Sequence, residues 1–186
     1  MIAEERIARI ARCLDDKKIA YMVIGGQAVL LYGRPRLTYD IDITLGVDSD
    51  QFETIAEVCG DVDLKILPVE PKVFANQTKV LPAEDPVSQL RVDFIFSFMP
   101  YERQALKRTK KVQLAGYPVC FASCEDVIIH KMIAGRAIDE EDVKSILIRQ
   151  GGEIDLDYVK GWLEKFEVMP EYAGVLKKFE KLFNIT

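Results

Sequence analysis

The stretch Gly25–Ile43, GGQAVLLYGRPRLTYDIDI, decides the fold of this chain. It follows an apolar run at 19–24 that is typical of a buried strand, and its glycine pair marks an abrupt turn into a short apolar helix over 27–32. A second turn over 33–38 leads into YDIDITL at 39–45, whose alternation of apolar and polar residues predicts a half-buried strand.

Two aspartates of this second strand, Asp40 and Asp42, are candidates for cation binding. Side chains two residues apart in a strand point to the same face, so both carboxylates can converge on one ion. The apolar residues of the segment, with Tyr39 and Ile41 among them, are expected on the opposite face. The same alternation also describes an ordinary solvated strand face, and both interpretations stay open at this point.

A third aspartate, Asp93, lies within LRVDFIF at 90–96, which we expect to be a strand covered on both faces. An ionised carboxylate in such a place is costly unless it is paired. Arg91 projects on the same face two residues earlier and could form a structural ion pair with it. Alternatively, Asp93 lies beside Asp40 and Asp42, and the three carboxylates then need a divalent cation such as Mg²⁺ or Mn²⁺ between them.

Phosphate-binding elements are predicted on either side of the short helix. Gly25 and Gly26 would let a phosphate approach the backbone, and the amides of the helix N-terminus favour an anion there. A glycine pair also serves tight packing alone. Arg34 and Arg36, in the loop before the acidic strand, could hold phosphates or pair with acidic side chains.

The remaining pattern predicts an α+β sheet domain with a helical C-terminal part. The domain boundary is expected near residue 122, with a sheet domain over 1–122 and helices over 123–186 packed on it. Four of the eight prolines fall in Pro68–Pro86, which we interpret as a long connection with at most one short helix around 72–77. A capping box of Asp48 and Gln51 is expected to open a helix that ends near 59–60. The other expected elements are helices at 3–17, 123–134, 139–149, 156–166 and 171–183 and a hairpin of strands at 110–114 and 117–121.

Composition excludes several function classes. The chain has 186 residues and a formal net charge of -5, which argues against broad adhesion to nucleic acid or to an anionic membrane. Its one histidine, His130, excludes a zinc site of several histidines and is expected at the surface or an interface. The longest uncharged run, at 19–33, is too short to span a membrane. Four cysteines without repeated short spacing predict reduced thiols and a cytoplasmic location.

The segment 25–43 resembles the signature of nucleotidyltransferases of the DNA polymerase beta superfamily. Its pattern is closest to the AbiEii-type branch, whose core motif GGxAxxxxGxxRxTxDxD is matched in register by the glycine pair, Arg36, Thr38 and both aspartates. The resemblance implies the fold of that family, a mixed β-sheet flanked by helices, here with a helical C-terminal extension. It also implies two Mg²⁺ (or Mn²⁺) ions and the transfer of a nucleoside monophosphate from an NTP to an acceptor.

Carried over to this chain, the resemblance assigns roles to individual residues. Asp40, Asp42 and Asp93 match the catalytic metal-binding carboxylates, and Asp93 is the candidate for deprotonating the acceptor. Lys131 matches a catalytic phosphate ligand with Asp142 as its partner or as a nucleotide contact, unless the two form a buried bridge between helices. Whether Asp139 or Asp142 fills the motif stays open. The nucleotide-binding residues implied are Gly25, Gly26, Arg34, Arg36, Thr38, Lys131 and Asp142.

The resemblance leaves the acceptor open. RNA such as tRNA, or a protein, is expected as acceptor, and the branch suggests a toxin with a cognate antitoxin protein as partner. The alternatives are a small-molecule, antibiotic-type nucleotidyltransferase and a non-catalytic member that binds a nucleotide or a partner. A basic channel reaching the run Lys107–Lys111 would favour RNA, whereas an acidic acceptor pocket would favour the small-molecule enzyme.

Overall fold

The computed structural model describes residues 3–184, which form two compact units. Unit 1 contains the chain up to Gln27 together with Thr38–Ala122. Unit 2 contains Ala28–Leu37 together with the chain from Ser123 onward. The short helix α2 (Gly25–Tyr32) therefore begins in unit 1 and ends in unit 2.

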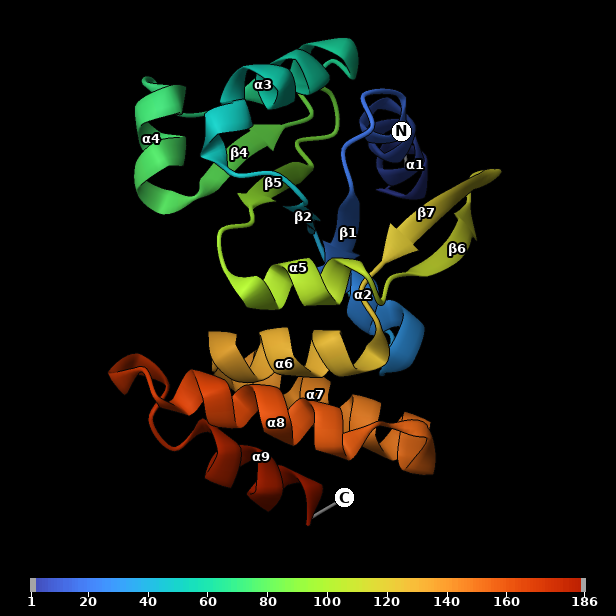
Figure 1. Ribbon diagram of the computed structural model, residues 1–186. Helices are drawn as coiled ribbons and strands as arrows, with labels where there is room; N and C mark the ends of the chain where they lie inside the picture. The colour runs from blue at the N-terminus through green and yellow to red at the C-terminus, as the bar shows by residue number, and fades with distance from the viewer. Residues whose placement is uncertain (1–2, 185–186) are drawn as a thin grey trace. The chain divides into compact units, whose positions relative to one another are not determined.

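Unit 1 is built on a seven-stranded mixed sheet with the strand order β3-β4-β5-β2-β1-β7-β6 (Figure 1). At its centre, β2 pairs antiparallel with β1 and parallel with β5. The strands are β1 (Tyr21–Ile24), β2 (Asp40–Leu45), β3 (Lys65–Ile66), β4 (Val80–Glu84), β5 (Arg91–Phe96), β6 (Lys110–Leu114) and β7 (Tyr117–Phe121). The mixed sheet flanked by helices confirms the fold class predicted from the sequence.

One face of the central strands is sealed by the core of unit 1. Ile41, Ile43 and Leu45 of β2 are fully buried, as their alternation predicts. The amphipathic helix α1 (Ala3–Asp16) buries its apolar stripe and contacts β6, β7 and α3 (Phe52–Asp61). Because the apolar side chains use one face, the aspartates of β2 are left on the other.

Two expectations about the central strands are wrong in part. Strand β5 is not covered on both faces, because only Val92, Phe94 and Phe96 are buried whereas Asp93 is partly exposed. Tyr39 lies just before β2 and is 69% exposed, so it does not share the burial of the apolar face. Asp93 therefore lies on a partly open face of the sheet, where an ionised carboxylate is far less costly.

The segment Pro68–Pro86 is not a long connection. It contains the expected short helix, α4 (Pro71–Thr78), but also the strand β4, which pairs antiparallel with both β3 and β5. Pro82 lies in the middle of β4 and is opposite Asp93, and its carbonyl accepts a hydrogen bond from the backbone amide of Leu67 at 3.0 Å. Proline removes only the donor of a residue, so this strand tolerates it.

A helix that the sequence analysis did not anticipate, α5 (Pro100–Leu106), follows β5. Its first turn carries the usual signals, since Pro100 takes the first helical position and Glu102 accepts a 2.7 Å hydrogen bond from the backbone amide of Met99.

A buried ion pair fixes the turn before β5. Arg6 of α1 pairs with Asp85, and both side chains are almost fully buried. Asp85 also accepts backbone hydrogen bonds from Val87 and Ser88 at 2.9 and 3.3 Å. Burial tends to raise the pKa of this carboxyl, but the backbone amides and Arg6 outweigh it and hold the pKa well below its ordinary value.

Unit 2 is helical. Apart from the end of α2, it consists of α6 (Cys124–Ala134), α7 (Ala137–Gln150), α8 (Leu156–Glu167) and α9 (Val175–Phe183), with α6 contacting the other three (Figure 1). Ser123 caps α6 as expected, through a 3.2 Å hydrogen bond from the backbone amide of Asp126. The last predicted helix is interrupted, because a 3₁₀ turn at Pro170–Tyr172 ends before Gly174 adopts a left-handed conformation. No helix within residues 3–184 is long and apolar enough to cross a membrane.

Candidate active site

Asp42 and Asp93 are direct neighbours on the open face of the sheet. In the parallel pair of β2 and β5, Asp42 is in register with Asp93, and Asp40 is in register with Arg91. Adjacent strands lie roughly 4.8 Å apart, so the two paired carboxylates repel each other unless a positive charge compensates them. The ion pair with Arg91 is confirmed, because Asp93 accepts a 2.9 Å hydrogen bond from Nε of Arg91, and Asp93 also lies beside the β2 aspartates. A cation between the three carboxylates stays a prediction.

Arg91 is the cation of this face. Its hydrogen bond to Asp93 is the main reason that its pKa lies above the ordinary value, and the charges of Asp40 and Asp42 act in the same direction. The half-exposed Arg91 side chain pairs with Asp93. Counted over these four side chains alone, three carboxylates and one guanidinium carry a negative formal charge, which favours the binding of a cation.

The backbone of Gly25 packs directly against the carboxylate of Asp42. The two strands β1 and β2 place Ile24 opposite Asp42, so the chain enters α2 directly beside this side chain. A Cβ at Gly25 would lie 1.9 Å from Oδ2 of Asp42, and the residue has a φ of +63°, which L-residues with side chains rarely adopt. Only glycine fits here, and Asp42 is held near the N-terminus of α2, where a negative charge is favoured.

The start of β2 is fixed by side chains that converge on one backbone oxygen. The carbonyl of Asp40 accepts long hydrogen bonds from Nε2 of Gln27 at 3.5 Å and from Oγ1 of Thr38 at 3.4 Å. Gly26, the second glycine of the motif, is buried in the first turn of α2. Thr38 and Gln27 therefore position the strand that carries the aspartates.

The donor set suits a hard divalent cation. Carboxylate oxygens are the ligands that Mg²⁺ and Mn²⁺ prefer, and Asp40, Asp42 and Asp93 share one face. The cradle that Gly25 leaves around Asp42 fits this use. In the arrangement described, Asp93 is turned to Arg91, and no three acidic, cysteine or histidine side chains among residues 3–184 stand close enough to hold a metal ion. Binding of an ion by all three aspartates therefore requires their carboxylates to come closer together than in the arrangement described.

Unit 2 contains a separate cluster of the remaining predicted residues. Lys131 of α6 donates to Asp139 at 2.8 Å and lies 2.9 Å from Asp142, both on α7. Arg36 binds both carboxylate oxygens of Asp142, at 2.8 and 2.9 Å, and Arg136 binds both oxygens of Asp139, at 2.7 and 3.0 Å. Asp139 and Asp142 thus share Lys131 equally, and the structure supports the buried-bridge alternative for Lys131.

The electrostatics of this cluster are those of a closed ion-pair network. Burial tends to raise the pKa of Asp142, but hydrogen bonds from Arg36 and Lys131 outweigh it and lower the pKa below its ordinary value. Asp139 behaves in the same way with Arg136 and Lys131. The three side chains at the centre, Lys131, Asp139 and Asp142, are at most 5% exposed.

The loop before β2 is pinned to α7. The backbone amide of Arg34 donates to Oγ of Ser145 at 3.1 Å, and Arg149 donates to the carbonyl of Gly33 at 2.7 Å. A Cβ at Gly33 would lie 2.5 Å from the Ser145 hydroxyl, so glycine is needed for this approach. Arg34 itself extends its side chain to the surface, unlike Arg36.

His130 is not the surface residue that the sequence analysis expects. Its Nε2 is buried, and burial, followed by the neighbouring charge of Lys131, lowers the pKa of the imidazole to about 4. The ring is therefore neutral at physiological pH.

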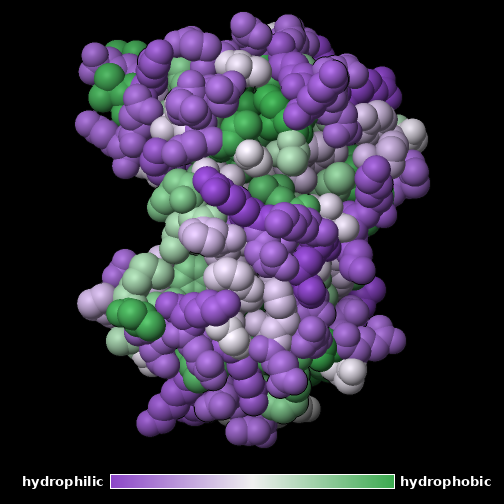
Figure 2. Space-filling model, viewed as in Figure 1, coloured by the Kyte–Doolittle hydropathy of each residue, from purple (hydrophilic) through white to green (hydrophobic). Residues whose placement is uncertain are grey.

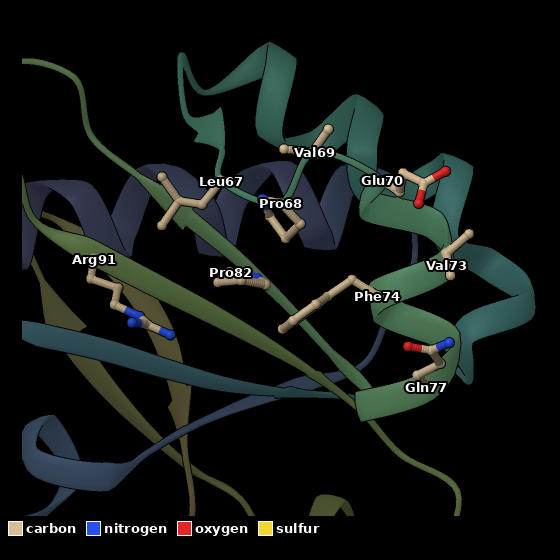
Figure 3. Close-up of a pocket in the computed structure, with 9 residues that line it drawn as sticks. All are labelled: Leu67, Pro68, Val69, Glu70, Val73, Phe74, Gln77, Pro82 and Arg91. Atoms are coloured by element: carbon tan, nitrogen blue, oxygen red, sulfur yellow. The ribbon is translucent and has the colours of Figure 1, made fainter.

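The sequence analysis missed the residues that flank Asp93 on its β4 side. Pro82 is the direct partner of Asp93, and Phe74 of α4 lies beside Pro82 (Figure 3). Pro82 argued against a strand at β4, because proline is rare inside strands. The alternation of Val80, Pro82 and Glu84 with apolar residues between them was the available signal.

Comparisons with known proteins agree with the fold described above. The family described as "Nucleotidyltransferase of unknown function (DUF6036)" matches residues 2–178. No curated protein sequence matches the chain.

Three solved structures show the same fold. The antibiotic-resistance factor ANT(2'')-Ia is 14% identical with a TM-score of 0.63, over 89% of this chain and 93% of that protein. The lincosamide antibiotic adenylyltransferase LnuA, in its lincomycin-bound form, is 16% identical with a TM-score of 0.55, over 78% and 96%. An antigenic nucleotidyltransferase-like protein from Paracoccidioides brasiliensis is 16% identical with a TM-score of 0.54, over 94% and 91%. The predicted nucleotidyltransferase fold is therefore confirmed.

Proposed function

Because the chain belongs to the nucleotidyltransferase family of unknown function (DUF6036), we propose that it moves a nucleoside monophosphate from an NTP to the hydroxyl of an acceptor. The family match supports the prediction of a transferase enzyme. The observation that carries the proposal is the direct register of Asp42 with Asp93 on an open sheet face, with Gly25 closing around Asp42. An acidic face of this kind is built to hold a cation.

In this proposal, Asp40, Asp42 and Asp93 hold the divalent cation, Mg²⁺ or Mn²⁺. When bound, the cation supplies charge compensation for the phosphates and for the transition state. Gly25 keeps Asp42 in place, whereas Thr38 and Gln27 keep the start of β2 in place. Backbone amides of Gly25 and Gly26, at the start of α2, are proposed to contact the nucleotide phosphates.

Asp93 is the proposed acceptor of the hydroxyl proton. Arg91 binds its Oδ1, which leaves Oδ2 as the oxygen that can receive the proton. The role of Arg91 is then to orient Asp93 toward the acceptor. Arg91 is a positioning residue under this proposal.

The basic residues of unit 2 divide into two roles. Arg34 is the proposed phosphate-binding cation, because its side chain is exposed. Arg36 is a second candidate that Asp142 holds in one orientation through two hydrogen bonds. Lys131 is buried between two aspartates, so we propose that it and Asp142 serve nucleotide binding by positioning Arg36.

Transfer of label from α-³²P-labelled NTPs tests the function. Wild-type protein and Asp42→Asn are each incubated with Mg²⁺, the four NTPs in turn, and total tRNA or cell lysate as acceptor source. We expect Mg²⁺-dependent labelling by the wild type and a loss of at least about 100-fold in the variant, a typical cost of removing a catalytic group. Equal labelling by both proteins would contradict the mechanism.

The finer assignment to the AbiEii-type branch is also a proposal, and it rests on the motif at 25–43. It predicts a cytoplasmic toxin with a cognate antitoxin protein. An adjacent reading frame for a small DNA-binding protein, and relief of growth arrest on its co-expression, would support this assignment. Growth that is unaffected by expression of the chain alone would count against it.

A further inference from the structure

A groove in unit 1 lies between α4 and the strands β4 and β5 (Figure 3). Its volume of about 460 Å³ is in the range of small-molecule sites. Figure 3 shows Phe74 extending from α4 toward Pro82, with Arg91 on the far side of that proline. The lining residues are Leu67, Pro68, Val69, Glu70, Val73, Phe74, Gln77, Pro82 and Arg91.

The groove adjoins the carboxylate that the proposed function uses as base. Pro82 is in direct register with Asp93, so both lie on the same face of the sheet, with side chains roughly 5 Å apart. Arg91 lines the groove and also binds Asp93. A molecule in the groove that contacts Arg91 therefore lies near the carboxylate that would take its proton.

The surface of the groove is mostly apolar and accessible. Phe74 is 38% exposed and Val73 is 47% exposed, and Figure 2 shows apolar residues at the surface around α4. A flat ring can pack on the exposed parts of Phe74 and Val73, an arrangement that gains both burial and aromatic contact. Glu70, Gln77 and Arg91 supply the polar groups of the lining.

Charge distinguishes between the classes of acceptor. The lining holds one carboxylate and one guanidinium, so it attracts neither a polycation nor a polyanion. The basic residues Lys110 and Lys111 lie on β6, at the other edge of the sheet, with β2, β1 and β7 between β6 and β5. Four strand spacings amount to roughly 19 Å, so Lys110 and Lys111 do not reach the groove.

We propose that this groove binds the acceptor, and that the acceptor is a small molecule of low charge with a flat apolar ring and a hydroxyl group. This inference rests on the proposed function. The acceptor oxygen forms a bond to the α-phosphorus of the NTP, the bond from that phosphorus to the bridging oxygen of the β-phosphate breaks, and pyrophosphate leaves. The hydroxyl proton passes to Oδ2 of Asp93.

The test uses 2-(2-naphthyl)ethanol as probe, with binding followed by saturation-transfer NMR and transfer followed with α-³²P-ATP and Mg²⁺. Phe74→Gln and Val73→Gln remove apolar surface from the groove at partly exposed positions, so both variants should fold. Phe98→Gln, at a 52% exposed phenylalanine outside the groove lining, is the matched control. Spermine and a tRNA transcript serve as the polycationic and polyanionic acceptors.

We expect the probe to bind the wild type and Phe98→Gln alike, and to bind Phe74→Gln at least about fivefold more weakly. The Tm shift caused by ATP with Mg²⁺ should be the same in the wild type and in the three variants, because the substitutions lie outside the proposed nucleotide site. The probe should accept label, and Val73→Gln should reduce that labelling.

Two results would overturn the proposal in distinguishable ways. Equal binding of the probe by Phe74→Gln and by the wild type overturns the groove assignment, and so does labelling of spermine or tRNA alone. In both cases, a Tm shift with ATP and Mg²⁺ leaves the proposed function standing. Absence of any Tm shift with ATP and Mg²⁺ in the wild type overturns the proposed function and this inference with it.

Discussion

Both units place aspartates beside arginine or lysine, but the two groups of side chains differ in burial and in their balance of charge. On the sheet face of unit 1, Asp93 pairs with Arg91 beside Asp40 and Asp42, and these groups are partly exposed. In unit 2, the two aspartates of α7 are matched by three cations and are almost fully buried; these cations are Lys131, Arg36 and Arg136.

The difference between the units follows from burial. A buried carboxylate must be fully compensated, so every oxygen of Asp139 and Asp142 has a partner and none is left for a ligand. A partly exposed carboxylate is solvated by water, so unit 1 can keep an excess of negative charge that an ion can neutralise. We therefore propose a ligand role for the aspartates of the unit 1 face and a structural role for the two aspartates of α7.

Replacement of Lys131 by methionine should give the largest effect. It removes the cation that lies between Asp139 and Asp142, and with it one charge-assisted contact to each buried aspartate, so we expect the free energy of unfolding to fall by about 3–5 kcal/mol. Each aspartate keeps its arginine. Urea denaturation measures it. Lys144→Met, which breaks an exposed pair with Glu141 on the same helix α7, is the control and should cost under about 0.5 kcal/mol. Similar losses in both variants would show that the cluster is not a structural network.

Acid should destabilise the protein through His130. Its folded-state pKa of about 4 lies below the ordinary value of 6.5, so the unfolded state takes up the proton first. The stability that the neutral ring contributes is present above pH 6.5 and is lost as the pH falls toward 4, by up to about 3 kcal/mol.

Urea denaturation between pH 7 and pH 4 measures the contribution of His130, and His130→Leu should flatten the decline. Asp139 and Asp142, whose pKa values are lowered, contribute a further loss only below about pH 4. An unchanged pH dependence in His130→Leu would assign the decline to other groups.

Gly25→Ala should damage unit 1 more than a comparable glycine replacement does. The new Cβ would lie 1.9 Å from Oδ2 of Asp42, in addition to the strain of a positive φ. Gly116→Ala, with a φ of +77° and no atom within 4 Å of the added Cβ, carries the strain alone. We expect Gly25→Ala to be less stable than Gly116→Ala by about 1–3 kcal/mol and to lose the Tm shift with ATP and Mg²⁺. Equal behaviour of the two variants would show that Asp42 does not depend on this cradle.

Arg91→Gln should give the smallest change in the free energy of unfolding. It tests whether the charge of Arg91 opposes the binding of an ion at the unit 1 face. Its pair with Asp93 is partly exposed, so we expect the free energy of unfolding to change by less than about 1 kcal/mol. One positive charge and a divalent ion about 6 Å apart in water repel each other by about 1.4 kcal/mol, so removal of the charge should tighten Mn²⁺ binding roughly tenfold. Mn²⁺ titration followed by electron paramagnetic resonance measures it, and weaker binding in the variant would show that Arg91 does not oppose the ion.

The sequence predicted the unit 1 face better than the unit 2 cluster for a physical reason. Alternation in β2 reveals which side chains share a face, and the motif at 25–43 places the glycine pair before it, so Asp40, Asp42 and Gly25 could be assigned. The register that pairs Asp42 with Asp93 is set by packing of the whole sheet, and sequence spacing could offer it only as one of two alternatives.

Other features depended on tertiary contacts that local patterns do not encode. Pro82 hid the strand β4 because proline usually ends strands, and its tolerance depends on the pairing geometry with β3 and β5. Lys131 was predicted to bind phosphate, whereas helix packing in unit 2 buries it between two aspartates. His130 was expected at the surface or an interface, whereas the same packing buries its Nε2. Burial of a single helical residue follows from its neighbours in space.

Binding of Mn²⁺ in the presence of ATP tests the central claim most directly, because it needs no knowledge of the acceptor. Electron paramagnetic resonance titration should be made on the wild type, on Asp42→Asn, and on Asp50→Asn as an exposed carboxylate of unit 1 away from the face. We predict saturable binding by the wild type and by Asp50→Asn, and binding at least about tenfold weaker in Asp42→Asn. Equal binding by all three proteins would contradict the account.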